Sequence, residues 1–180
     1  RAIWQSVPES RRPHVTFVNL PRAFEPGDEG TQLIFADGTR LPFADASFDI
    51  AFSNSVIEHV GDWTAQRAFA DEIRRVARAY WVQTPNRRFP VEQHLLTPVV
   101  HWLPRRVQRR VVPAANVWKF VAKPDREQAS FYYSHYLNDI RLLTAAGMRD
   151  LFPDAQLLRE RFAGLTKSLI AWRAALSSYL

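Results

Sequence analysis

Short apolar runs alternate with longer segments of helical period through the first half of this chain. The runs are rich in β-branched and aromatic residues, which favour strands. They cover residues 14–20, 31–36, 48–54 and 79–84. Between the last two runs, apolar residues recur on one face of a helix expected over residues 63–78. The alternation is typical of βαβ units, so we expect an α/β fold with a mostly parallel sheet and flanking helices.

The alternation stops after residue 90. Residues 91–125 mix Pro, Arg and large apolar residues, so we expect a helical insertion over residues 91–136, on the substrate side or as a lid. Further on, one helix face is predicted from Ile140, Leu143, Gly147, Met148 and Leu151. The stretches 155–164 and 165–176 are expected to form an antiparallel pair that turns at Gly164, with the strand at 165–173 antiparallel to the rest of the sheet.

The composition limits the class of protein. With 180 residues, 47% of them hydrophobic and 23% charged, residues 1–180 are expected to form a single globular domain. The sequence has no apolar run long enough for a membrane span and no signal-peptide pattern, and we interpret the protein as cytoplasmic. The absence of Cys excludes disulfides, thiolate metal sites and a cysteine nucleophile. No metal site is predicted from the sequence.

Polar side chains stand where the predicted strands end. Asn19, Asp37 and Asn54 each follow or close an apolar run. In open α/β sheets ligands bind outside the carboxyl ends of the strands, so these side chains are candidates for a binding site. Gly38 would let a planar ligand approach the backbone, and the Asp37 carboxylate would accept from an exocyclic amine. The alternative is an ordinary Asp-Gly turn.

The stretch DGTRLPFADASFDIAFSNSVIEHV, residues 37–60, resembles class I S-adenosylmethionine-dependent methyltransferases of the methyltransferase type 11 group. The resemblance covers residues 13–90 and implies a Rossmann-like fold in which the run at 79–84 is the fifth strand. It implies S-adenosylmethionine as cofactor, with Asp37 on the adenine amine. The cofactor-binding residues that it implies are Asn19, Leu20, Asp37, Gly38, Thr39, Asn54, Ser55 and Val56.

Two features depart from the family pattern. Asn19 stands where the family has an acidic residue on the ribose hydroxyls, so cofactor affinity should be lower. No Gly-x-Gly pair occurs, and the first ten residues resemble the end of the helix that follows the family's glycine loop. We therefore expect the sequence to begin inside the domain, and the strands at 14–20 and 48–54 to be separated by a gap that upstream chain or another molecule fills.

Glu58 and His59 are the candidate catalytic residues, as bases for an acceptor that must lose a proton. The alternative for Glu58 is a capping box with Ser55 at the start of a helix, and this alternative outweighs catalysis. His59 is weighed evenly, because His titrates near neutral pH. The candidate substrate-binding residues are Asn86, Arg87, Glu92, His94, Tyr133 and His135. A solvated turn or an aromatic core is the alternative for these.

The basic residues are concentrated. Residues 85–112 hold six Arg against one Glu, or +5 of the formal net charge of +6. Within residues 102–112, a basic stripe of Arg105, Arg106, Arg109 and Arg110 lies beside Trp and Leu, a pattern typical of peripheral contact with an anionic membrane or a lipid-linked acceptor. Nucleic acid phosphates would also suit it, and a solvated helix face is the plain alternative.

The sequence favours methyl transfer to a small-molecule or lipid-linked acceptor. Nucleic acid is disfavoured as a substrate, because residues 53–56 lack the Asn/Asp-Pro-Pro-aromatic motif of amino-methylating enzymes with this fold, and there is no Cys for carbon methylation of pyrimidines. The alternative is a non-catalytic relative that docks on a membrane surface or a protein partner.

Overall fold

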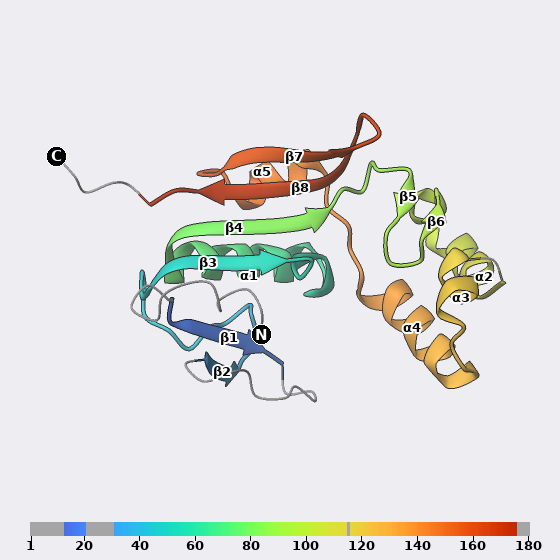
Figure 1. Cartoon of the computed structure of the whole chain (residues 1–180), viewed down its shortest axis with the longest axis horizontal. Helices are drawn as coiled ribbons and strands as arrows, with labels where there is room; N and C mark the ends of the chain where they lie inside the picture. Colours follow the sequence, from blue (N-terminus) through green and yellow to red (C-terminus); the bar gives the residue numbers. More distant parts are fainter. Residues whose placement is uncertain (1–12, 21–30, 115, 176–180) are drawn as a thin grey trace.

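The computed structural model describes residues 13–20, 31–114 and 116–175, and the helix end expected over residues 1–10 lies outside this part. The main sheet has the strand order β3-β4-β8-β7 (Figure 1). Its strands are β3 (Phe48–Asn54), β4 (Ala77–Pro85), β7 (Gln156–Phe162) and β8 (Leu165–Arg173). β3 and β4 are parallel, and β8 is antiparallel to both β4 and β7, so the sheet is mixed.

A second, two-stranded sheet holds the beginning of the described chain. β1 (Val15–Asn19) and β2 (Thr31–Phe35) pair in parallel. Among the described residues, β1 pairs with β2 and β3 pairs with β4, while β1 and β3 do not pair. The expectation that these strands are not neighbours in one sheet is confirmed. What fills the gap between them stays a prediction.

Helix α1 (Trp63–Val76) connects β3 to β4, as its apolar face predicts. The Asp62 carboxylate accepts from the backbone N–H of Ala65 and begins the helix. The buried core between this helix and the main sheet consists of Ile57, Phe69, Ala70, Ile73, Tyr80, Val82, Leu143, Met148, Leu151, Phe152, Leu169 and Ala171. This core fixes the position of the β3 end, where the candidate site residues begin.

Beyond β4 the chain forms the expected helical insertion. It contains β5 (Val91–Glu92), β6 (Thr97–Pro98), η3 (Val100–Trp102), α2 (Arg105–Ala114), α3 (Val117–Ala122) and α4 (Arg126–Asp139). It has a core of its own, made of Leu95, Val100, Val112, Tyr133, Tyr136 and Ile140. In Figure 1 these helices lie to one side of the main sheet, beyond the carboxyl ends of β3 and β4. No helix in the described ranges has the length and apolar character that crossing a bilayer requires.

The predicted helix face from residue 140 to residue 151 is wrong in its first half. α4 ends at Asp139 and α5 (Ala145–Leu151) begins after Thr144, whose hydroxyl accepts from the Gly147 N–H. Ile140 and Leu143 are buried in the connection between the two helices, each in a different core cluster. The apolar periodicity in the sequence therefore arose because residues in the connection and residues in α5 are all buried, although they do not belong to one helix. The β7–β8 hairpin is confirmed, with Gly164 at φ +79° in its turn.

Candidate functional site

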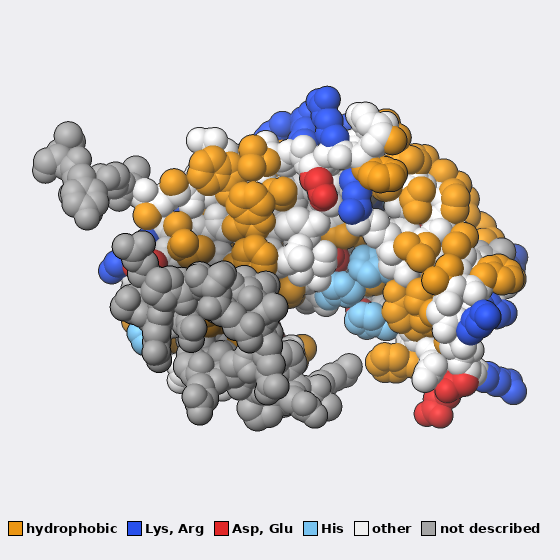
Figure 2. All heavy atoms as spheres, in the orientation of Figure 1, with side chains coloured by type: hydrophobic (Ala, Val, Ile, Leu, Met, Phe, Trp, Pro, Cys, Tyr) orange, Lys and Arg blue, Asp and Glu red, His pale blue; other side chains and the backbone are white. Residues whose placement is uncertain are grey.

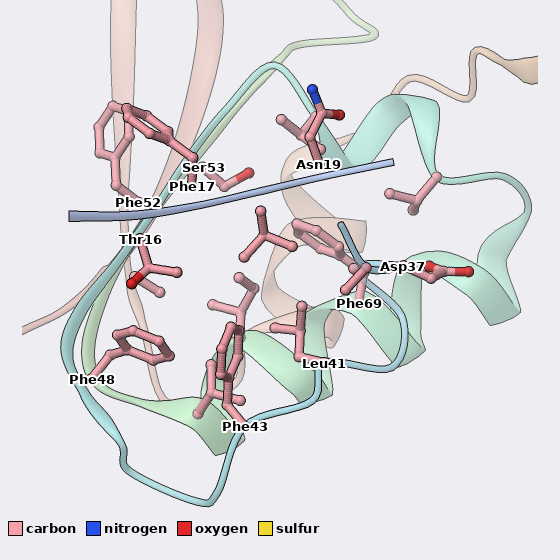
Figure 3. Close-up of a pocket in the computed structure, with 18 of the residues that line it drawn as sticks. Thr16, Phe17, Asn19, Asp37, Leu41, Phe43, Phe48, Phe52, Ser53 and Phe69 are labelled. Carbon is pink, nitrogen blue, oxygen red and sulfur yellow. The ribbon is translucent and has the colours of Figure 1, made fainter. Parts of the chain in front are cut away.

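A cavity of about 510 Å³ lies between β1 and β3 (Figure 3). Its walls are largely apolar, and they include Phe17, Leu41, Phe43, Phe48, Phe52 and Phe69. Six of the eight predicted cofactor-binding residues line it: Asn19, Leu20, Asp37, Gly38, Asn54 and Val56. Thr39 and Ser55 do not. His59 also lines this cavity, so one candidate catalytic residue shares it with the predicted cofactor-binding residues.

Asp37 is held as an ionised side chain at the cavity. Its Oδ1 accepts from both the backbone N–H and the hydroxyl of Thr39, each at 2.8 Å. The backbone hydrogen bond, followed by the hydroxyl, lowers the pKa of Asp37 below its ordinary value. Its Oδ2 has no hydrogen bond within the described ranges. Thr39 therefore orients the carboxylate, and one carboxylate oxygen is left for a ligand.

Gly38 is required by packing. A Cβ at this position would lie 2.8 Å from Cδ2 of Phe69, which is closer than such atoms approach. The glycine thus lets the Asp37 turn sit directly on α1, a reason that the sequence did not supply. Its part in admitting a planar ligand remains a prediction.

Two further predicted residues are fixed by hydrogen bonds around the cavity. The Asn19 Oδ1 accepts from the backbone N–H of Leu20 at 2.9 Å, so the amide N–H₂ is the part of this side chain that remains for a ligand. Ser55, which has a φ of 53°, donates its hydroxyl to Gln83 Oε1 at 3.0 Å. Ser55 is thus tied to β4 and holds the turn in which β3 ends.

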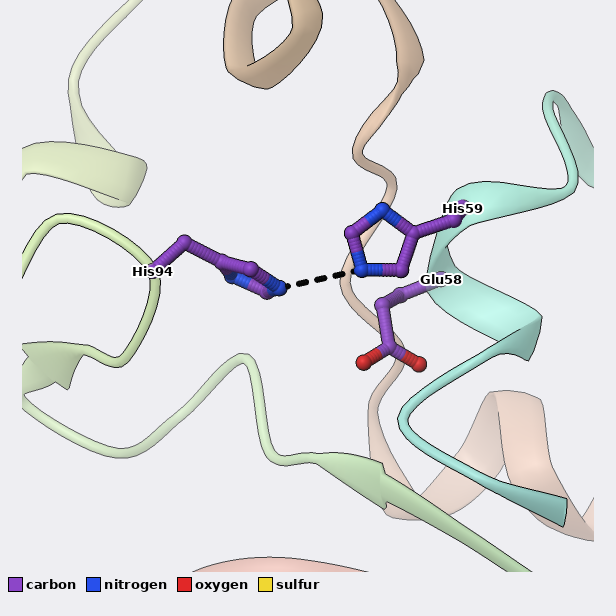
Figure 4. Close-up of side chains that lie close together, drawn as sticks. All are labelled: Glu58, His59 and His94. Atoms are coloured by element: carbon purple, nitrogen blue, oxygen red, sulfur yellow. Dashed lines mark hydrogen bonds between the residues drawn. The ribbon is translucent and has the colours of Figure 1, made fainter. Parts of the chain in front are cut away.

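Three histidines from distant parts of the chain form a row beside the cavity. His59 lies on η2 (Ile57–His59), directly after β3. Its Nε2 is 3.2 Å from Nε2 of His94, as Figure 4 shows, and its Nδ1 is 3.2 Å from Nε2 of His135 on α4. In Figure 2 histidine side chains gather between the main-sheet side and the helical side of the molecule. Both outer histidines were predicted as substrate-binding residues, and the structure brings them to His59.

Each outer histidine is held by one carboxylate. His94 Nδ1 is 2.7 Å from Glu92 Oε1, and His135 Nδ1 is 2.7 Å from Asp139 Oδ2. Glu92 is itself buried and accepts from the backbone N–H of Leu95 at 2.6 Å through its other oxygen. These bonds fix the ring orientations, so that both outer histidines turn Nε2 toward His59.

Glu58 lies under the histidines and is completely buried, with 0% of its surface exposed. Its Oε2 accepts from the Thr84 hydroxyl at 2.8 Å, while its Oε1 is buried without a hydrogen bond in the described ranges. Burial raises the pKa of this carboxyl above its ordinary value. The capping-box interpretation is wrong: η2 has no side-chain cap, because Ser55 bonds to Gln83 and Glu58 points into the histidine row.

The electrostatics of the row differ from one ring to the next. Burial, together with the neighbouring His94 and His135, lowers the pKa of His59 to about 4. Burial also acts to lower the pKa of His94, but the hydrogen bond to Glu92 and the charges of Glu92 and Glu58 outweigh it, and the pKa is raised. His59 is thus neutral at neutral pH, with a nitrogen lone pair available.

The remaining predicted substrate-binding residues lie outside this row. Asn86 is buried, donates to the Thr166 carbonyl and accepts from the Arg88 N–H, so it shapes the end of β4. The Arg87 side chain is exposed. Tyr133 belongs to the core of the helical insertion, and its hydroxyl accepts from Asn116.

Two contributors were missed by sequence reasoning. Asp139 stands four residues after His135 on α4, a spacing at which helical side chains meet, so the signal was present in the sequence. Thr84 orients Glu58 from β4 across 26 positions, and no local pattern announces such a contact. Glu58, His59 and His94 also offer one ligand atom each, and these atoms lie within 4.8 Å of one another.

Comparison with known proteins bears on this arrangement. Residues 15–79 match the family described as "Methyltransferase domain". The chain is 14% identical to a SAM-dependent methyltransferase from Methanosarcina mazei, covering 81% of this chain and 68% of that one with a TM-score of 0.45. For a SAM-dependent methyltransferase from Thermotoga maritima, the identity is 15%, the coverages 79% and 64%, and the TM-score 0.43.

A candidate Zn-dependent alcohol dehydrogenase from Rhodobacter sphaeroides has 9% identity, with coverages of 81% and 66% and a TM-score of 0.50. At this identity the likeness concerns the α/β fold alone. The chain thus spans about two thirds of the length of these solved structures. No curated protein matches the sequence. The chain is therefore similar to the methyltransferase domain family over residues 15–79, from β1 to the start of β4, and the α/β fold agrees with that match.

Proposed function

We propose that the protein transfers a methyl group from S-adenosylmethionine to an acceptor that binds beside His59. The observation that carries the proposal is one cavity, lined both by the polar residues at the carboxyl ends of the strands and by His59. Binding at the carboxyl ends of strands is the rule for open α/β sheets. A mainly apolar cavity with a few convergent polar groups also has the character of a cofactor site.

The residues present fit this cofactor. The free Oδ2 of ionised Asp37 accepts from an amine, and the Asn19 amide donates to a hydroxyl. The Phe and Leu side chains of the cavity provide apolar contact for a planar ring. When bound, S-adenosylmethionine supplies an electrophilic methyl group.

The protein's own contribution is positioning. In-line methyl transfer needs the acceptor atom held against the methyl group, and no proton moves unless the acceptor loses one. His59 is the ring that reaches from the cavity to the histidine row. In this proposal His59 takes the proton of a hydroxyl or amine acceptor, and the buried Glu58 carboxylate lies beside the row (Figure 4).

The acceptor in this proposal is a small or lipid-linked molecule held under the helical insertion. The insertion exposes large apolar side chains, of which Phe120 is 72% and Val121 is 67% exposed. Arg106, Arg109 and Arg110 of α2 are exposed as well. Cations beside exposed apolar groups favour a membrane surface where a lipid-linked acceptor resides. The same surface supports the second candidate function, a non-catalytic module that docks on a membrane, and the neutral Asn19 favours it.

Ligand-induced stabilisation tests the proposal. A compound that binds only the folded protein raises its melting temperature in proportion to the logarithm of its concentration over Kd. We expect S-adenosylmethionine and S-adenosylhomocysteine to raise the melting temperature, and ATP at the same concentration to raise it less. A melting temperature that neither sulfur compound changes would contradict the proposal and leave the docking module as the function.

A further inference from the structure

The distance between the Nε2 atoms of His59 and His94 matches that of two imidazole nitrogens bound to one metal ion. Two nitrogens bound to one Zn²⁺ at 2.0–2.1 Å and at a tetrahedral angle are roughly 3.3 Å apart. The two Nε2 atoms are 3.2 Å apart. Their ring planes are at 80° to each other, so the rings converge on the contact edge-on and do not stack.

When all three rings are neutral, the hydrogen atoms of the row account for only one of its two nitrogen–nitrogen contacts. His94 and His135 donate their Nδ1 hydrogens to Glu92 and Asp139, so each neutral ring presents a lone pair at Nε2. A neutral His59 has one N–H for these two lone pairs. One nitrogen pair at 3.2 Å then lacks a hydrogen between its atoms. A cation at the His59–His94 contact resolves this, with the single His59 hydrogen on Nδ1, toward His135.

An independent observation comes from Glu58. This side chain is 0% exposed, and its Oε1 has no hydrogen bond from any residue in the described ranges. An unpaired buried carboxylate oxygen is costly unless a cation or a donor meets it. The Glu58 carboxylate lies beside the two imidazoles, and its ligand atom falls within 4.8 Å of both of theirs.

The surroundings have the form of an outer coordination shell. Metal-bound histidines characteristically donate their other ring N–H to a carboxylate, which fixes the ring and raises its basicity. His94 has this arrangement through the buried Glu92. Thr84 orients Glu58 by donating its hydroxyl to Oε2, which leaves Oε1 without a hydrogen bond in the described ranges.

From these observations we propose that Glu58, His59 and His94 bind one divalent first-row transition-metal ion, through one carboxylate oxygen and two imidazole nitrogens. Mixed nitrogen and oxygen ligands suit Zn²⁺ and its neighbours in the series better than Mg²⁺ or Ca²⁺. Three protein ligands leave a coordination position open, as in catalytic sites. The proposal goes beyond methyl transfer and does not depend on it. With the ion bound, an acceptor hydroxyl would coordinate the metal, which would lower the pKa of that hydroxyl, and its proton would pass to solvent because the His59 lone pair would then be used by the metal.

Metal titration of the whole protein tests the proposal. With Zn²⁺ as the probe, calorimetry should show one ion bound per chain. Bound Co²⁺ should show the visible absorption bands of a four-coordinate site. His94→Gln and the nearly isosteric Glu58→Gln each remove a ligand and should abolish this binding. Glu92→Gln changes only the outer shell and should weaken it roughly 10–100-fold. Circular dichroism checks that each variant is folded.

The matched control is His14→Gln, which removes an exposed histidine outside the row and should leave the affinity unchanged. Wild-type protein that binds no Zn²⁺, or binding that His94→Gln and Glu58→Gln leave intact in folded protein, would overturn the proposal. Equal weakening by His14→Gln would also overturn it, because the ion would then be held elsewhere. None of these results depends on S-adenosylmethionine.

Discussion

His59 and His94 are 35 positions apart in the chain, yet their Nε2 atoms lie 3.2 Å from each other. One histidine follows the third strand and the other belongs to the helical insertion, so this contact joins the two parts at the edge of the cavity. Because the buried Glu92 holds His94 from the insertion and His59 directly follows β3, the contact is built by both parts together. Any chemistry at His59 is therefore coupled to the position of the insertion.

The first prediction concerns Asp154, which ties the main sheet to α1. Its carboxylate accepts from the Tyr80 hydroxyl at 2.8 Å and from Arg74 at 2.9 Å, and also from Arg173. Burial acts to raise the pKa of Asp154, but the bonds from Tyr80 and Arg173 outweigh it and the pKa is lowered. A lowered pKa stabilises the fold above the unfolded value of about 3.9, and this stabilisation is lost as the pH falls through the folded value.

Asp154→Asn should therefore lower the free energy of unfolding at pH 7 by about 1–2 kcal/mol, since the site is partly exposed. The deficit should begin to shrink as the pH falls below the unfolded pKa of about 3.9, and should vanish below the lowered folded pKa, where the wild-type carboxyl is itself protonated. Urea unfolding of the wild-type protein and the variant, at pH 7 and again below the unfolded pKa, measures this deficit. Asp49→Asn is the control, because Asp49 forms an exposed pair with Arg78. A deficit that does not change with pH would show that the charge of Asp154 contributes nothing.

The second prediction follows from the contact between Gly38 and Phe69. Gly38→Ala places a methyl group 2.8 Å from the Phe69 ring, and overpacking of this kind costs about 1–3 kcal/mol. Combining it with Phe69→Leu should cost less than the sum of the two single changes, because the smaller side chain makes room. Gly147→Ala is the control, since a Cβ at that position would lie no closer than 3.4 Å to any neighbouring side chain. Additive losses would mean that the two residues do not clash.

The strands and the crossover helix were predictable because their signals are local. The run at 48–54 is predictable from its β-branched and aromatic residues, and the helix face that includes Phe69 and Ile73 from its burial, and both elements are found at the expected places. The helix face from Ile140 failed because residues buried in two different clusters imitate one period. Glu58 failed as a cap for a related reason: a four-residue motif cannot reveal Thr84, which holds the carboxylate from another strand.

Candidate site residues were predictable in part. The polar ends of the strands follow from a general rule of α/β sheets, and Asn19, Asp37 and Asn54 do line one cavity. The histidine row depends on how the insertion packs back on the sheet, which periodicity does not encode. The sequence named His94 and His135 without indicating that both would face His59.

The third prediction concerns the membrane surface. If the stripe on α2 contacts anionic lipid, the protein should pellet with phosphatidylserine-containing vesicles, and pelleting should decrease as salt is raised. Replacing Arg106, Arg109 and Arg110 with Gln should weaken the free energy of membrane binding by about 1 kcal/mol for each residue near the surface, and pelleting should decrease accordingly. Arg105 is left unchanged, because it donates to Gln108 and to the Ile140 carbonyl and so supports the fold.

Arg159 and Arg161 on β7 are exposed cations outside this region, and their replacement by Gln serves as the matched control. Equal pelleting of wild-type protein and the α2 variant would leave the stripe as a solvated helix face. Equal loss in the β7 variant would mean that only total charge matters.

The central claim is that Asp37 binds the cofactor through its free oxygen, and calorimetric titration with S-adenosylmethionine measures this directly. Loss of a hydrogen bond to a charged group costs about 1.5–3 kcal/mol, so Asp37→Ala should weaken binding roughly tenfold to a hundredfold. Asp37→Asn keeps the shape but replaces an acceptor oxygen with an amide, and it should also lose affinity while the fold survives. Wild-type affinity in both variants would contradict the account and leave Asp37 as the residue that only shapes its turn with Thr39.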